Sequence, residues 1–143
     1  MKIDPRPGQR RKILIIEDDS DIRNFLKMLF AQYSYEVETS DSGLTGLASF
    51  AHFMPDIIIL DLAMPDMDGM TFLARRGQIG RIKDIPILVL SARDGHGDVV
   101  GAMTAGAAAY IAKPFDNAKL LATVKKLAGP AIEPEAASTR VSW

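Results

Sequence analysis

Two groups of acidic residues come directly after two apolar segments of strand length. The acidic residues 17–19 follow the apolar run Ile13–Ile16, and Asp61 follows the run Ile57–Leu60. In a parallel α/β sheet the carboxyl ends of adjacent strands open onto one crevice, so these carboxylates would meet there although they are distant in sequence. Crowded carboxylates repel one another unless a divalent cation lies among them. The sequence therefore predicts a Mg2+ site.

Two further polar side chains are expected at the same edge of the sheet. Ser91 follows the apolar run Ile85–Leu90, and Lys113 follows the run Ala108–Ala112. Carboxylates, a hydroxyl and an ammonium group together suit phosphoryl transfer, which needs a nucleophile, a cation and fixed donors for the phosphoryl oxygens. In this hypothesis Asp61 attacks the phosphorus, and Mg2+, Ser91 and Lys113 hold the oxygens.

The elements that would position these residues alternate regularly along the chain. Apolar runs predict strands at Lys12–Ile16, Tyr35–Thr39, Asp56–Leu60, Ile85–Leu90 and Ala108–Ala112. Apolar residues at helical spacing predict helices over residues 22–30, 44–51, 68–78, 94–105 and 120–127, with Asp68 and Asp94 able to cap the third and fourth. This alternation predicts an α/β fold with a doubly wound, five-stranded parallel sheet. The first, third and fourth strands are the most apolar and should be central.

Composition limits the domain count and the function classes. The chain has 143 residues, 48% of them hydrophobic, and a net charge of −1. This length predicts one globular domain over residues 11–128, with flexible tails at 1–10 and 129–143. The balanced charge gives no sign of direct nucleic-acid binding. The absence of cysteine excludes disulfides and thiolate metal sites. No apolar run approaches a membrane span or a signal peptide, so no membrane insertion and a cytoplasmic location are expected.

These motifs, in this order, resemble the receiver domain of two-component and phosphorelay response regulators, which has a (βα)5 flavodoxin-like fold. The resemblance covers about residues 11–128. The segments that carry it are Lys12–Asp19, Asp61–Gly69, Leu90–Ala92, Gly106–Ala107 and Tyr110–Phe115.

The resemblance implies a phosphoacceptor and its metal site. Asp61 would be the phosphoacceptor, and Glu17 and Asp18 would form the acid pocket. Asp18, Asp61 and the backbone carbonyl of Ala63 would bind Mg2+, with Glu17 acting through water. Asp19 is expected to cap the following helix rather than to bind the metal. The phosphoryl donor would be a histidine kinase or a histidine phosphotransfer protein.

The resemblance also implies a conformational switch. A cis peptide bond between Lys113 and Pro114 would aim the lysine into the site. Ser91 and Tyr110 match the family's switch pair, in which the hydroxyl moves to the phosphoryl oxygen and the aromatic ring turns inward. The output face would be formed by residues 94–105, 108–112 and 115–127. The downstream protein target is unknown.

Two positions flank the path of the hydrolytic water in receiver domains, and here they hold Ala63 and Arg93. Neither side chain is a carboxylate or an amide that could orient water well. The pair therefore predicts slow autodephosphorylation, which suits a relay intermediate. The domain would catalyse only its own phosphorylation and dephosphorylation and would not otherwise be an enzyme.

Three other functions fit the same residues less well. A haloacid-dehalogenase-type, Mg2+-dependent aspartyl-phosphate phosphatase needs a second Asp two positions after the nucleophile, where this chain has Ala63. A nucleotide-binding module needs glycines after the first strand, where this chain has acidic residues. A degenerate receiver used only for protein contacts would have lost Asp61 or Lys113.

The short sequence after Gly129 favours a stand-alone receiver. Ala108–Ala109 argues against the charged dimer contact of winged-helix regulators.

Overall fold

The computed structural model describes residues 10–64, 69–76, 84–93 and 95–132. Within these residues the strands form one parallel sheet in the order β2-β1-β3-β4-β5. The strands are β1 (Lys12–Ile16), β2 (Glu36–Ser40), β3 (Ile57–Leu60), β4 (Ile87–Ser91) and β5 (Ala109–Ala112). The helices are α1 (Ser20–Gln32), α2 (Gly43–Phe53), α3 (Gly69–Arg76), α4 (His96–Thr104) and α5 (Asn117–Ala128). The predicted doubly wound α/β fold is confirmed.

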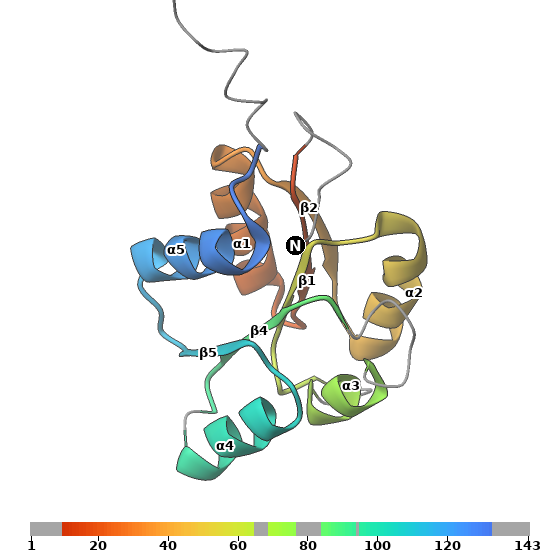
Figure 1. Cartoon of the computed structure of the whole chain (residues 1–143), viewed down its shortest axis with the longest axis vertical. Helices are drawn as coiled ribbons and strands as arrows, with labels where there is room; N and C mark the ends of the chain where they lie inside the picture. The colour runs from red at the N-terminus through yellow and green to blue at the C-terminus, as the bar shows by residue number, and fades with distance from the viewer. Residues whose placement is uncertain (1–9, 65–68, 77–83, 94, 133–143) are drawn as a thin grey trace, which may run out of the picture.

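The three central strands are buried on both faces, which explains their continuous apolar sequences. As predicted, β1, β3 and β4 occupy the centre of the sheet. One face packs against α1 and α5 through a core that includes Ile13, Leu26 and Leu120. The other face packs against α2, α3 and α4 through a core that includes Leu14 and Phe72. Figure 1 shows α1 and α5 on one side of the strands and α2 and α3 on the other.

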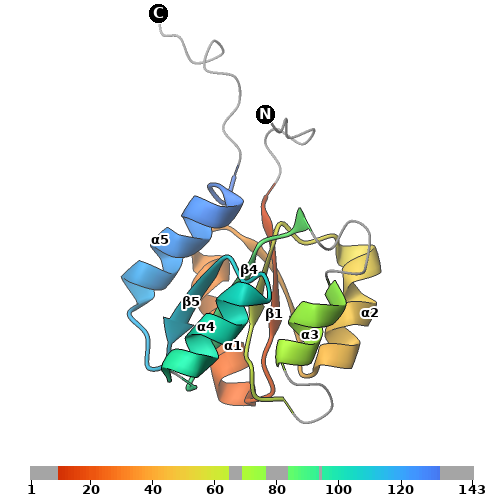
Figure 2. The ribbon, with the colours of Figure 1, turned by 60° about the horizontal axis from the view of Figure 1, so that its bottom comes forward.

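The strand register brings the carboxyl ends of the strands to one edge of the sheet. Ile16 of β1 pairs with Leu60 of β3, and Ser91 of β4 pairs with Ala112 of β5. After β1 the chain crosses to β2 on one side, and after β3 it crosses to β4 on the other. Such a switch point between β1 and β3 leaves a crevice beyond the carboxyl ends of these two strands. The turned view in Figure 2 shows α4 in front of β4 and β5.

The predicted strand bounds differ from the observed ones by at most two residues, and two of the differences have clear causes. Tyr35 lies before β2 rather than in it, because its backbone N–H donates to the carbonyl of Phe30 at the end of α1, 3.1 Å away. β4 begins at Ile87 rather than Ile85 because Pro86 has no N–H to donate to a ladder.

The helix starts are partly outside the described residues. Asp68 and Asp94, the two predicted caps, both lie there. The N-cap position of α4 is Gly95, which makes no side-chain cap hydrogen bond, so the prediction that Asp94 occupies this position is wrong. Asp19 does cap α1, since its Oδ1 accepts hydrogen bonds from the N–H groups of Asp21 and Ile22.

The ends of the described chain meet at the amino-terminal edge of the sheet. Arg10 and Ile132 form an isolated antiparallel bridge, and the N–H of Arg11 donates to the carbonyl of Ala131 at 2.6 Å. The predicted tails lie mostly outside the described residues, at 1–9 and 133–143. Among the described helices, none has the length and apolar character needed to cross a bilayer.

Candidate functional site

Three carboxylates converge at the edge where β1 and β3 end. Glu17, Asp18 and Asp61 each offer an oxygen atom within 4.8 Å of the others. Glu17 and Asp61 are only 2% and 6% exposed, whereas Asp18 is exposed. The backbone N–H of Asp61 donates to the carbonyl of Ile16 at 3.0 Å, so the sheet ladder itself holds the two acidic segments side by side. The structure thus brings together the acidic residues that the sequence predicts for the metal site.

Lys113 enters this cluster from the end of β5. Its Nζ lies 2.6 Å from Oε1 of Glu17 and 3.7 Å from Oδ2 of Asp61. Its backbone N–H donates to the carbonyl of Ser91 at 2.9 Å, and the Lys113–Pro114 peptide bond is cis. The ammonium is therefore placed among the carboxylates rather than in solvent.

Burial raises the pKa of the Glu17 carboxyl group. Loss of hydration is the main cause, and it raises this pKa to about 7. The hydrogen bond from Lys113 lowers the pKa, and the negative charge of Asp61 raises it. The N–H of Asp19 also donates to Oε2 of Glu17, at 3.2 Å. One ammonium group thus lies beside a cluster of three carboxyl groups. Hard divalent cations prefer oxygen ligands of this kind, so the donor set fits Mg2+.

Ser91 and Tyr110 are connected through the backbone of Arg93. Ser91 is the last residue of β4 and is fully buried, and its Oγ accepts a hydrogen bond from the N–H of Arg93 at 3.1 Å. The hydroxyl of Tyr110 donates to the carbonyl of Arg93. The two predicted switch residues do not touch each other in these bonds, but both hold the same residue of the loop after β4.

The loop after β3 folds back tightly onto Asp61. The N–H of Ala63 donates to Oδ1 of Asp61 at 3.3 Å, while the side chain of Ala63 is exposed. The N–H of Gly69 donates to the carbonyl of Leu62 at 2.8 Å. A Cβ atom at Gly69 would lie 2.6 Å from Cα of Leu62 and 2.7 Å from the carbonyl oxygen of Asp61. Only glycine lets α3 begin this close to the site.

Sequence reasoning missed one residue that contacts the acidic segment. Arg23 of α1 donates from Nη1 to the carbonyl of Glu17 at 2.8 Å and to that of Asp18 at 3.3 Å. No residue pattern in the sequence predicts this contact, because it depends on the angle between α1 and the end of β1.

Comparison with known proteins agrees with this geometry. Residues 13–125 match the family described as the response regulator receiver domain. Response regulator PleD of Caulobacter vibrioides is 38% identical over 117 residues, which cover 81% of this chain and 26% of PleD. The transcriptional regulatory protein CseB of Streptomyces coelicolor is 39% identical over 113 residues, covering 79% of this chain and 47% of CseB. The chain therefore spans between about a quarter and a half of the length of these relatives.

Solved structures give the same result for the fold. Chemotaxis protein CheY4 of Vibrio cholerae superposes with a TM-score of 0.78 at 30% identity, covering 82% of this chain and 98% of that one. The receiver domain of sensor histidine kinase PA1611 from Pseudomonas aeruginosa, solved with a magnesium ion coordinated in its active-site cleft, superposes with a TM-score of 0.77 at 25% identity. The superposed region covers 84% of this chain and 98% of the PA1611 receiver domain. The match of residues 13–125 is more than half of this sequence, and the chain belongs to the response regulator receiver domain family of two-component signalling.

Proposed function

We propose that this receiver domain takes a phosphoryl group onto Asp61 from a histidine kinase or a histidine phosphotransfer protein, with Mg2+, and that the phosphorylated state changes its output face. The observation that carries the proposal is the meeting of three carboxylates and one ammonium within a few ångströms. Asp61 is central to this group and buried, and it accepts the N–H of Ala63.

The proposed transfer is an in-line displacement at phosphorus. A carboxylate oxygen of Asp61 attacks and forms the new O–P bond, while the P–N bond to the donor's imidazole breaks and that nitrogen takes up a proton. The ammonium group of Lys113 lies 3.7 Å from Asp61 and can donate hydrogen bonds to the negatively charged phosphoryl oxygens. The hydroxyl of Ser91 would donate to one of these oxygens. The domain acts on itself, and no other substrate is proposed.

The residues that would hold Mg2+ are Asp18, Asp61 and the backbone carbonyl of Ala63, with Glu17 acting through water. The bound cation would offset the negative charge of the carboxylates and of the phosphoryl oxygens. The exposed position of Asp18 beside the buried Asp61 and Glu17 leaves one side of the cluster open to solvent. A phosphoryl donor can approach from this side.

The switch would follow from the bonds around Arg93. Phosphorylation adds about −1.5 to −2 charges and three strong acceptor oxygens. If the Ser91 hydroxyl turns to one of them, the N–H of Arg93 loses its present acceptor. The loop after β4 can then move, and with it the carbonyl that holds Tyr110. The affected surface comprises α4, β5 and α5, and its downstream partner would be a protein.

The proposal is tested by phosphorylation with acetyl phosphate, which needs no cognate kinase. Wild type should become phosphorylated in Mg2+ and not when the metal is chelated. Asp61→Asn should take up no phosphoryl group, because an amide is not a competent nucleophile. Asp21→Asn, at an exposed residue in the first turn of α1, is the matched control and should behave as wild type. Equal labelling of Asp61→Asn and wild type would contradict the proposal.

A further inference from the structure

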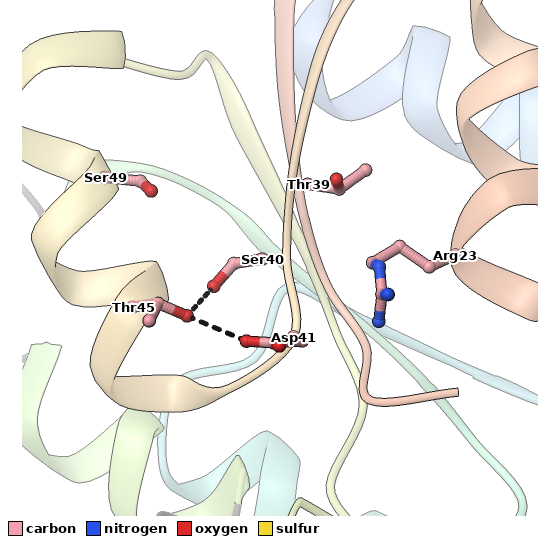
Figure 3. Close-up of a pocket in the computed structure, with 6 residues that line it drawn as sticks. All are labelled: Arg23, Thr39, Ser40, Asp41, Thr45 and Ser49. Carbon is pink, nitrogen blue, oxygen red and sulfur yellow. Dashed lines mark hydrogen bonds between the residues drawn. The ribbon is translucent and has the colours of Figure 1, made fainter. Parts of the chain in front are cut away.

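Arg23 lies where helix α1 passes the end of β1. Its backbone N–H donates to the carbonyl of Asp19 at 2.9 Å, inside the first turn of the helix. Its side chain folds back in the opposite direction, and Nη1 donates to the carbonyls of Glu17 and Asp18. One residue thus bonds to the backbone of all three acidic residues. Figure 3 shows its guanidinium on one side of β2, with Thr45 and Ser49 on the other.

The backbone segment that Arg23 holds needs external support. Its carboxylates converge on Asp61 with oxygen atoms within 4.8 Å, and like charges at this distance push one another apart. The sheet fixes the beginning of the segment, since the N–H of Glu17 donates to the carbonyl of Ser40 at 3.0 Å. The cap of α1 fixes its end at Asp19. Between these two anchors, the carbonyls of Glu17 and Asp18 point to Arg23.

A guanidinium is well suited to this position. It is planar, always charged, and presents several N–H donors in fixed directions, so it can bond two successive carbonyls at once. Its positive charge also lies beside the acidic segment. The side chain lines an open polar pocket of about 300 Å3, together with Thr39, Ser40, Asp41, Thr45 and Ser49. The guanidinium of Arg23 therefore remains in contact with solvent, and its charge stays hydrated.

From these contacts we propose that Arg23 is a positioning residue of the Mg2+ site. It holds the backbone of Glu17 and Asp18 so that both carboxylates remain turned toward Asp61. It touches neither the cation nor the phosphoryl group. The inference rests on the proposed Mg2+ site, and it adds a residue that acts on the affinity of that site through the main chain.

The test is a Mg2+ titration of the full chain, followed by the backbone amide signals in NMR spectra. Arg23→Ala should bind Mg2+ about tenfold more weakly than wild type, the size of effect typical of residues that orient metal ligands. Arg23→Lys keeps the charge but not the forked donors, and its affinity should fall between the two. Lys27→Ala is the matched control, since Lys27 is exposed one turn further along α1. It should bind as wild type.

Phosphorylation rates separate positioning from a role in the chemistry. With acetyl phosphate, Arg23→Ala should be slower than wild type at low Mg2+ and should reach the wild-type rate when Mg2+ is saturating. A rate that stays low at saturating Mg2+ would contradict the proposal, because Arg23 would then act on the phosphoryl group.

Thermal melts in the absence of Mg2+ address a purely structural role. Such a role predicts a lower Tm for the two Arg23 variants with unchanged Mg2+ affinity of the folded protein, and this result would overturn the proposal. If Arg23→Ala does not fold, the Mg2+ affinity and the Tm of Arg23→Lys are compared with those of wild type in the same way. Failure of wild type itself to bind Mg2+ would instead reject the proposed function.

Discussion

Lys113 and Glu17 form an ion pair of 2.6 Å between residues 96 positions apart in the chain. Both side chains are mostly buried, at 14% and 3% exposed. Lys113 also lies 3.7 Å from Asp61, so a small movement of the ammonium would bring it from Glu17 to the proposed phosphoacceptor. In the proposed transfer, phosphoryl oxygens on Asp61 would compete with Glu17 for this lysine.

The first prediction separates a metal ligand from a helix cap. Asp18→Asn should weaken Mg2+ binding on the order of tenfold or more, because a hard cation loses a charged oxygen ligand. Asp19→Asn should bind nearly as wild type, since Asp19 caps α1 and Asn caps a helix equally well. Calorimetric titration with Mg2+ measures both. Equal losses would mean that the acid pocket is shifted by one residue.

The second prediction concerns the switch. Ser91→Ala should leave phosphorylation largely intact but should weaken the response at Tyr110, because the loop after β4 loses its hydroxyl partner. The lost hydrogen bond should also cost about 1 kcal/mol in the free energy of unfolding. NMR shift changes on phosphorylation measure the response, with Lys27→Ala as a control at an exposed residue of α1, outside the proposed output face. A full wild-type response in Ser91→Ala would rule out this coupling.

The third prediction concerns the lifetime of the phosphorylated state. The side chains of Ala63 and Arg93 are both exposed at the site, and neither can orient a hydrolytic water as a carboxylate or amide would. Wild type should therefore lose its phosphoryl group slowly in Mg2+ after the donor is removed. The double variant Ala63→Asn, Arg93→Glu should lose it faster. Decay of wild type within seconds, or no acceleration in the double variant, would contradict this expectation.

The fourth prediction concerns Tyr35, which is remote from the site. Burial raises the pKa of its phenol, against a smaller opposing effect of Arg11, and its hydroxyl donates to the carbonyl of Gly129 at 3.1 Å. The folded state then holds this proton more tightly than the unfolded state. The contribution of Tyr35 to stability should be fully present below about pH 10 and should be lost as pH rises through the folded-state pKa.

Tyr35→Phe removes both effects. It should cost about 1 kcal/mol at neutral pH through the lost hydrogen bond. Its free energy of unfolding should also fall less steeply above pH 10 than that of wild type. Urea unfolding at several alkaline pH values measures the difference, and parallel curves for the two proteins would show that Tyr35 does not titrate with folding.

The fold was predictable because local signals agreed. Continuous apolar runs such as Ile13–Ile16 indicate strands buried on both faces, and Asp19 caps α1 as its position suggests. Element ends were less predictable where one group decides them. β4 begins after Pro86, which has no N–H to donate. β2 begins after Tyr35, whose N–H donates to the carbonyl of Phe30 at the end of α1.

The candidate site was predictable only where side chains follow directly from strand ends. Glu17, Asp61 and Lys113 come together because parallel strands in register end at one edge. Contacts made by folding back across a helix or a turn have no such pattern. Arg23 reaches its carbonyls, and Tyr110 reaches Arg93, through angles set by tertiary packing.

The most direct test of the central claim is to locate the phosphoryl group chemically. The full chain is incubated with acetyl phosphate and Mg2+ and then reduced with borohydride, which converts an aspartyl phosphate to homoserine, and its peptides are sequenced by mass spectrometry. We predict homoserine at position 61, and none there when Mg2+ is chelated. Homoserine at another aspartate with an unmodified Asp61, or no modification at all, would contradict the assignment of Asp61 as the phosphoacceptor.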